Sequence, residues 1–123
     1  MNNDTLLYRQ VHPSWIQDGQ ITSQVFIPTP KDEKMLSAYD GDIVSSQDSW
    51  IHYTGELGNE SDGVVAVSYE ECAIQNVTPL PDPETFDAHV LIDYSSQSES
   101  KIRKRISKEL KSCALNRGWL YQP

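Results

Sequence analysis

The stretch SQSESKIRKRISKELKSCALNRG, residues 96–118, holds the most regular pattern in the chain and decides its fold class. Its apolar residues recur at spacings of four, four, three and one, which predicts an amphipathic helix with one face toward a core. Ser96 and Glu99 fit a capping box at the start, and Gly118 fits a helix stop. The apolar face consists of Ile102, Ile106, Leu110, Cys113 and Ala114. The apolar face of such a helix must pack against another layer of secondary structure, which the rest of the chain has to form.

That second layer is predicted to be a sheet, because several shorter segments alternate or are apolar throughout. Val64–Tyr69 is apolar on both faces, which favours a central strand covered on two sides. Further strands are expected at Leu6–Val11, Ile21–Ile27, Leu36–Tyr39 and Ala88–Tyr94. Strands interleaved with helices indicate an α+β fold, with a small, mostly antiparallel sheet packed by two or three helices and a C-terminal amphipathic helix.

Two more helices and two connectors are expected between these strands. A helix from Ser46 follows from the shared face of the apolar and aromatic residues at 50–57. Ser68-x-x-Glu71 is a second capping-box pattern and predicts a short helix through Ile74.

The connectors are recognised by their prolines. Residues 28–34 combine two prolines with four consecutive charges, which predicts an exposed loop. Residues 78–84 hold three prolines at alternate positions, which predicts an extended connector without regular pairing.

The chain has 123 residues, of which 37% are hydrophobic and 23% are charged. This length and composition predict a single α+β domain spanning residues 1–123. Cys72 and Cys113 have no ligands at metal-binding spacing, so we expect two buried thiols, no metal and no cofactor. No stretch approaches the roughly 18 apolar residues of a membrane span, and the N-terminus lacks a secretion signal. We therefore expect no membrane contact and a cytoplasmic location.

Charge is unevenly distributed along the chain. Residues 1–100 carry 17 acidic and 3 basic residues, whereas residues 101–123 carry 1 acidic and 7 basic residues. The formal charge of -8 disfavours duplex DNA as the main partner, because such binding depends on neutralising phosphates. An acidic body instead favours a protein partner with a basic surface, to which this chain is an accessory or immunity-like subunit. The simpler alternative is acidity for solubility alone. The candidate contact residues are Asp40, Asp42, Asp48 and Trp15.

A small-molecule site is the other hypothesis. Arg9 and His12 lie at a strand end, and an arginine fork beside a histidine can hold an anionic ligand. Ser23 and Phe26 on the following strand complete this candidate set. His89 and Asp93 cannot hydrogen-bond each other, since four strand residues span about 13 Å. Without a known catalytic motif, the catalytic residues stay unknown.

A third possibility concerns the end of the chain. Residues 119–121 can form an edge strand, through which two copies of the protein can pair.

Two resemblances extend these hypotheses. The residues His12-Pro13-Ser14-Trp15-Ile16-Gln17-Asp18-Gly19, with Ser23-Gln24-Val25-Phe26, Pro28-Thr29-Pro30-Lys31-Asp32-Glu33, Leu36-Ser37 and Tyr39-Asp40-Gly41-Asp42, resemble a group of small uncharacterised bacterial proteins. That resemblance implies a bacterial origin and a stand-alone protein, but it implies no particular activity. Leu7-Tyr8-Arg9, followed by Ser23, Phe26 and Pro28, is similar to the strand arginine and later serine of ADP-ribosyltransferase-like NAD-binding folds. This second likeness implies an NAD-binding enzyme with its site near Arg9 and His12, although no glutamate matches the catalytic one.

Overall fold

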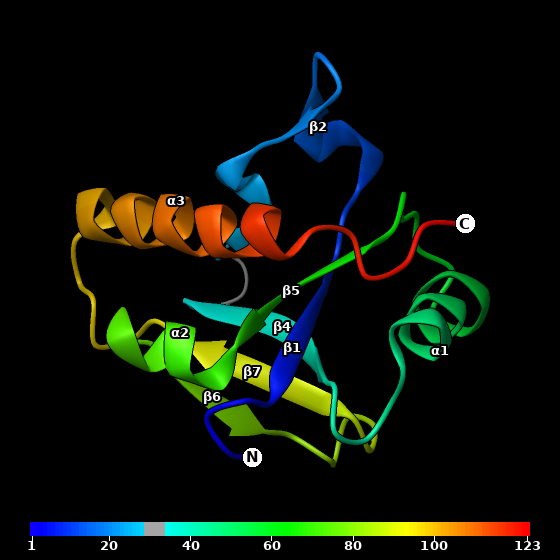
Figure 1. Ribbon diagram of the computed structural model, residues 1–123. Helices are drawn as coiled ribbons and strands as arrows, with labels where there is room; N and C mark the ends of the chain where they lie inside the picture. The colour runs from blue at the N-terminus through cyan, green and yellow to red at the C-terminus, as the bar shows by residue number, and fades with distance from the viewer. Residues whose placement is uncertain (29–33) are drawn as a thin grey trace.

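A five-stranded antiparallel sheet forms the middle of the computed structural model, which describes residues 1–28 and 34–123 (Figure 1). The strand order in these residues is β5-β1-β4-β7-β6, and each neighbouring pair runs antiparallel. The strands are β1 (Leu6–Gln10), β4 (Met35–Asp40), β5 (Val64–Ser68), β6 (Thr78–Pro81) and β7 (His89–Asp93). A separate hairpin pairs β2 (Ile16–Gln17) with β3 (Gln20–Ile21). The prediction of an α+β fold with a mostly antiparallel sheet is confirmed.

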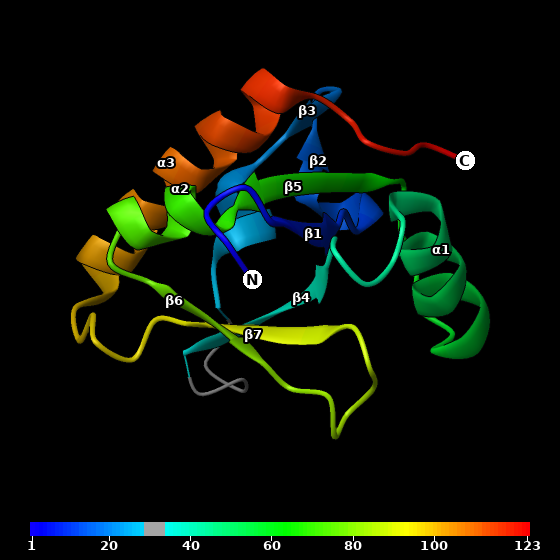
Figure 2. The same cartoon turned by 60° about the horizontal axis from the view of Figure 1, so that its bottom comes forward.

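One face of the sheet is covered by two α-helices and a 3-10 turn, and Figure 2 shows both helices on that side. These elements are α2 (Tyr69–Ile74), α3 (Ser100–Arg117) and η2 (Ser23–Phe26). The predicted apolar face of α3 meets the sheet, and its fully buried members are Ile106, Leu110 and Ala114. Gly118 follows α3 with a φ of 85°, a backbone region that favours glycine, so the predicted helix stop is confirmed.

The opposite face carries a second apolar cluster beneath α1 (Ser46–Ile51) and the C-terminal tail. Trp50 of α1 contacts Tyr121, with 5.6 Å between the ring centroids. The backbone of the tail pairs with β5, because the Val64 N–H donates to Tyr121 O and the Leu120 N–H donates to Val64 O, both at 2.9 Å. The tail therefore covers the first residue of β5, close to α1 in both views.

The two shorter helices predicted between the strands, from Ser46 and from Ser68, are both present. Ser68 and Glu71 form the predicted capping box, since the Ser68 N–H donates to Glu71 Oε1 at 2.7 Å and the Glu71 N–H donates to Ser68 Oγ at 3.1 Å. The helix expected from Ser46 is also confirmed. It continues directly into a π-helical turn, η4 (His52–Glu56). A π-helix has more residues per turn than an α-helix, so successive side chains point in different directions than they would in a regular α-helix.

The sheet opens between β1 and β4. These strands share two residue pairs, Leu7–Asp40 and Tyr8–Tyr39, whereas β1 pairs with β5 along its whole length. Arg9 spans the opening: its Nε donates to the Val25 carbonyl oxygen and its Nη1 donates to the Ser37 carbonyl oxygen, each at 2.7 Å. The guanidinium thus supplies hydrogen bonds where the β1–β4 ladder has ended.

The strand predicted at Ile21–Ile27 is wrong. β3 ends at Ile21, and Ser23–Phe26 forms the 3-10 turn η2. A tight turn lets two consecutive side chains, Val25 and Phe26, both reach the core, which an extended strand does not allow. The Phe26 carbonyl oxygen accepts hydrogen bonds from the buried hydroxyls of Tyr94 and Ser107, each at 2.7 Å, and these replace a strand partner.

The connector predicted at residues 78–84 is wrong in its first half, where β6 (Thr78–Pro81) pairs with β7. The Asp82 N–H donates to the His89 carbonyl oxygen at 2.8 Å, so backbone groups at even positions face β7. The prolines occupy the odd positions, which face away from β7. Alternate prolines therefore permit an edge strand and also block pairing with another chain.

The start of α3 differs from the prediction. The capping box at Ser96 and Glu99 is absent, because α3 begins at Ser100 and the Glu99 side chain makes no cap bond. The Ser96 hydroxyl instead donates to the Asn76 carbonyl oxygen at 3.1 Å.

The segment predicted as a central strand, β5, is covered on both faces as expected but stands at the end of the strand order. Most of the loop predicted at residues 28–34 lies outside the described residues.

The described helices include none with the length and apolar character needed to cross a membrane.

Candidate functional site

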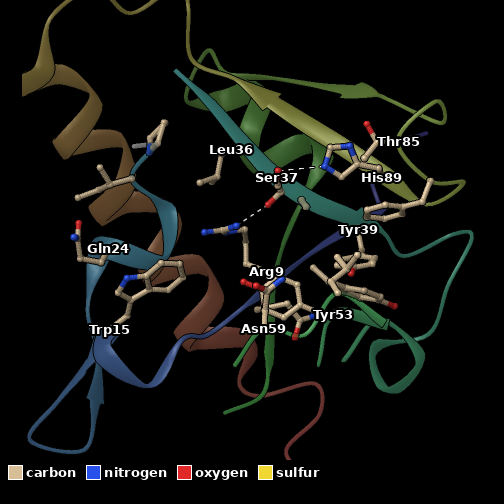
Figure 3. A pocket seen from close by; sticks show the side chains of 17 residues that line it. Arg9, Trp15, Gln24, Leu36, Ser37, Tyr39, Tyr53, Asn59, Thr85 and His89 are labelled. Carbon is tan, nitrogen blue, oxygen red and sulfur yellow. Dashed lines mark hydrogen bonds between the residues drawn. The ribbon is translucent and has the colours of Figure 1, made fainter. Parts of the chain in front are cut away.

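A cavity of about 590 Å³ occupies the opening between β1 and β4 (Figure 3). Its walls are mainly aromatic and aliphatic, and a few polar groups project into it. Figure 3 shows Trp15 and Gln24 at one end and Thr85 and His89 at the other, with Arg9 between them. This volume lies within the roughly 300–1,000 Å³ typical of small-ligand sites.

Local structure explains why these side chains meet. Alternation along β4 directs Ser37 and Tyr39 to the same face of the sheet. The π-helical turn η4 adds Tyr53 to the wall. The turn between β6 and β7 adds Phe86, whose ring lies 5.1 Å from that of Tyr39 and 4.8 Å from that of His89.

Ser37, His89 and Asp82 form a hydrogen-bonded relay that begins at the cavity wall, where Ser37 and His89 lie. Ser37 Oγ lies 3.2 Å from His89 Nε2, and His89 Nδ1 lies 2.8 Å from Asp82 Oδ2. Hydrogen bonds from Thr85 and then from His89 lower the pKa of the Asp82 carboxyl, so it is ionised at neutral pH. An ionised carboxylate only accepts hydrogen bonds, so Nδ1 carries the hydrogen in the bond to Asp82, and in an uncharged imidazole Nε2 can accept from the Ser37 hydroxyl.

A second histidine, His52, also contacts Phe86. The His52 and Phe86 rings are 4.6 Å apart, and His52 Nδ1 lies 2.7 Å from the Tyr39 hydroxyl. His52 Nε2 lies 3.3 Å from Glu56 Oε2. Burial, then the nearby Tyr53 and Glu56, raise the pKa of Tyr39, so its phenol stays protonated at neutral pH.

The structure separates the four residues proposed to bind a small ligand. Arg9 lines the cavity, but His12, Ser23 and Phe26 are outside the set of residues that line it. His12 instead accepts a hydrogen bond at Nδ1 from the Ser14 N–H at 3.1 Å, which caps the 3-10 helix Pro13–Trp15. Phe26 is fully buried in the core, and Ser23 begins η2.

The residues proposed for partner contact are also in different environments. Asp40 is buried at the end of β4 and accepts from the Asp42 N–H at 2.8 Å, so it organises the turn. Asp42 accepts a hydrogen bond from the Thr5 hydroxyl at 2.6 Å, whereas Asp48 is exposed in the first turn of α1. Trp15 lines the cavity, with the Arg9 guanidinium 5.5 Å from its ring centroid.

The sequence interpretation missed Ser37, Asp82 and His89 as a group. It compared His89 with Asp93 on the same strand, although the actual partner lies across the β6–β7 turn. One usable signal was Asp82-x-x-Thr85, a side-chain-stabilised turn directly before the strand that contains His89. Nothing local points to Ser37, which β4–β7 pairing brings into place.

Among the described residues, no group of three or more His, Cys, Asp or Glu side chains is placed to hold a metal ion. Comparison of the chain with known protein families, curated protein sequences and solved structures finds no match.

Proposed function

We propose that the cavity between β1 and β4 binds a small organic molecule with an apolar, preferably aromatic, body and a polar group. This function develops the small-molecule alternative raised by the sequence. The observation that carries it is a cavity of about 590 Å³ into which hydroxyl, imidazole and amide side chains project.

The walls favour stacking and apolar contact. Trp15, Tyr53 and Phe86 supply aromatic surface, and Leu36 adds aliphatic surface. Ser37 and His89 supply hydrogen-bonding groups at one end. A ligand with an apolar body and one polar end matches this division.

Arg9 has a positioning role in this proposal. Its Nε and Nη1 both donate to backbone carbonyl oxygens, of Val25 and Ser37, so these donors hold the cavity walls together. The proposal therefore does not depend on an arginine fork that clamps an anion, which was the basis of the sequence hypothesis.

The test is a titration of the ¹⁵N-labelled protein with phenol, benzoate, nicotinamide and NAD⁺, followed by NMR. We expect at least one mono-aromatic compound to shift backbone amides of β4, Phe86 and His89 in a saturable way. NAD⁺ tests the dinucleotide alternative directly. If none of the four compounds gives saturable shifts at the cavity, the proposal is wrong.

A matched pair of variants locates the binding. Asn59 is exposed and lines the cavity, so Asn59→Trp places a large side chain at its wall. Asn116 is exposed on α3 and does not line the cavity, so Asn116→Trp is the control. We expect binding to be lost in the first variant and kept in the second. Equal binding by both variants places the ligand elsewhere.

Partner binding is the second candidate, and exposed isoleucines support it. Ile43 is 58% exposed and directly follows Asp42, and Ile51 is 48% exposed and lies three positions after Asp48. Exposed apolar side chains with carboxylates nearby in the chain suit a protein partner with a basic surface and an apolar centre.

The variant Asp48→Lys/Ile51→Ser tests this candidate without disturbing Asp40 and Asp42, which support the turn. We expect the wild type to retain a host protein that 0.5 M salt releases, and the double variant to lose it. Glu60→Lys, another change at an exposed acidic residue, is the control and should retain the partner. Undiminished retention by the double variant counts against this surface.

A further inference from the structure

We propose that Ser37, His89 and Asp82 form a hydrolytic site that cleaves small carboxylic esters bound in the cavity. This inference rests on the proposed small-molecule function and adds a reaction to it. Ser37 is the nucleophile, His89 the general base and Asp82 a positioning residue.

The geometry of the relay supports these roles. The distance of 3.2 Å from Ser37 Oγ to His89 Nε2 permits proton transfer from the serine to the imidazole, and the 2.8 Å contact from His89 Nδ1 to Asp82 Oδ2 holds the imidazole in place. Ser37 is exposed and lines the cavity, so a ligand can reach its hydroxyl. The His89 side chain is only 10% exposed, and Asp82 holds it in one orientation.

The backbone holds the nucleophile in place. Ser37 lies two residues before Tyr39 in the chain, in the part of β4 that is not paired with β1. Its carbonyl oxygen accepts from Arg9 Nη1 at 2.7 Å, so the backbone edge at Ser37 faces the opening. In an antiparallel strand the N–H and C=O of one residue lie on the same edge. The Ser37 N–H therefore faces the opening, and in some serine hydrolases the nucleophile's own N–H is one of the oxyanion donors.

The reaction balances without a cofactor. Ser37 Oγ bonds to the ester carbonyl carbon while its proton passes to His89 Nε2. The tetrahedral intermediate then collapses, the carbon–oxygen bond to the alcohol breaks, and the alcohol leaves with the proton from His89. Water, deprotonated by His89, attacks the acyl-Ser37 ester; the acid departs and Ser37 recovers its proton.

The cavity sets the substrate class. Its volume suits a molecule of small-ligand size, and its aromatic walls suit an uncharged aryl or alkyl ester. We therefore choose 4-nitrophenyl acetate as the substrate probe and a fluorophosphonate as the covalent probe. In the covalent reaction Ser37 Oγ bonds to phosphorus and fluoride leaves.

The experiment uses the intact chain. We expect the fluorophosphonate to add once, with peptide mass spectrometry locating it at Ser37. We expect Ser37→Ala to lower kcat/KM for 4-nitrophenyl acetate at least about a hundredfold. Ser112→Ala, at an exposed serine on α3 outside the cavity, should match the wild type. Asp82→Asn should lower kcat while KM stays unchanged, which loss of a merely structural contact does not produce.

The outcomes separate the two proposals. If the wild type is not labelled at Ser37, or Ser37→Ala hydrolyses the ester at the wild-type rate, the hydrolytic role is overturned, and the relay is a structural tie between β4 and the β6–β7 turn. Mono-aromatic compounds that still bind in that case leave the small-molecule proposal standing. Labelling at Ser37 without saturable binding of any of those compounds supports hydrolysis and refutes the small-molecule proposal as stated.

Discussion

At the scale of the residue, Glu71 joins three elements. Its Oε1 accepts from the Ser68 N–H at 2.7 Å and from Arg117 Nη1 at 2.9 Å, which links the end of β5, the start of α2 and the end of α3. Burial opposes ionisation of Glu71, but the hydrogen bonds from Arg117 and Ser68 together outweigh it, and the pKa of the carboxyl is lowered.

This lowered pKa predicts a pH-dependent stability. Because the folded pKa lies below the unfolded one, ionised Glu71 stabilises the fold above the unfolded pKa, and this contribution disappears as pH falls through the folded value. We expect Glu71→Gln to lower the free energy of unfolding by about 1 kcal/mol at neutral pH. The difference from the wild type should vanish well below about pH 4.

Urea denaturation at several pH values measures the effect. Glu70→Gln, at the exposed neighbouring position, is the control and should show little difference at any pH. A constant loss in Glu71→Gln at all pH values contradicts the electrostatic explanation.

At the scale of the element, the C-terminal tail and β5 approach each other at Gly63. Gly63 has a φ of 152°, and a Cβ there would lie 2.5 Å from the Tyr121 carbonyl oxygen and 2.8 Å from the Trp119 ring. A glycine is therefore required for the tail to cover the edge of β5.

We expect Gly63→Ala to cost about 2 kcal/mol, because either the tail must move away from β5 or the backbone must strain. Thermal and urea unfolding measure this loss. Gly55→Ala is the matched control: a Cβ at Gly55 meets nothing within 4 Å, so stability should be unchanged or slightly higher. Equal stability of the two variants refutes a close approach at Gly63.

At the scale of the whole molecule, Arg9 links the two halves of the sheet. β5 and β1 form one half, and β4, β7 and β6 form the other; the β1–β4 ladder joins them through two residue pairs. The guanidinium bridges the remaining opening through its bonds to Val25 and Ser37. The same residue thus supports both the fold and the cavity.

We expect Arg9→Met to lower the free energy of unfolding by about 2 kcal/mol, because two backbone carbonyl oxygens lose their donors. Hydrogen exchange should also become faster at backbone amides of β4. Arg9→Lys keeps one donor group and should lose less stability. Unchanged exchange and stability in Arg9→Met mean that the two residue pairs alone hold the halves together.

The sequence predicted correctly those elements that depend on interactions between residues close together in the chain. The apolar period of α3, the Gly118 stop and the Ser68–Glu71 capping box depend on residues three or four positions apart, so they are visible in the sequence. Ile21–Ile27 failed because the buried hydroxyls of Tyr94 and Ser107, far along the chain, satisfy the Phe26 carbonyl in a turn. β6 was missed because only its pairing with β7 shows which positions the prolines occupy.

The sequence by itself determined the α+β class, the amphipathic C-terminal helix and the presence of Arg9 at a strand end, since periodicity and capping are short-range properties. Tertiary structure alone decided the strand order, the opening of the sheet and the relay. Ser37 and His89 are 52 residues apart in the chain. They meet because Ser37 pairs with Leu91 and Tyr39 pairs with His89, which makes Ser37 and His89 diagonal neighbours on one face. That register depends on contacts across the whole sheet, which no local pattern encodes.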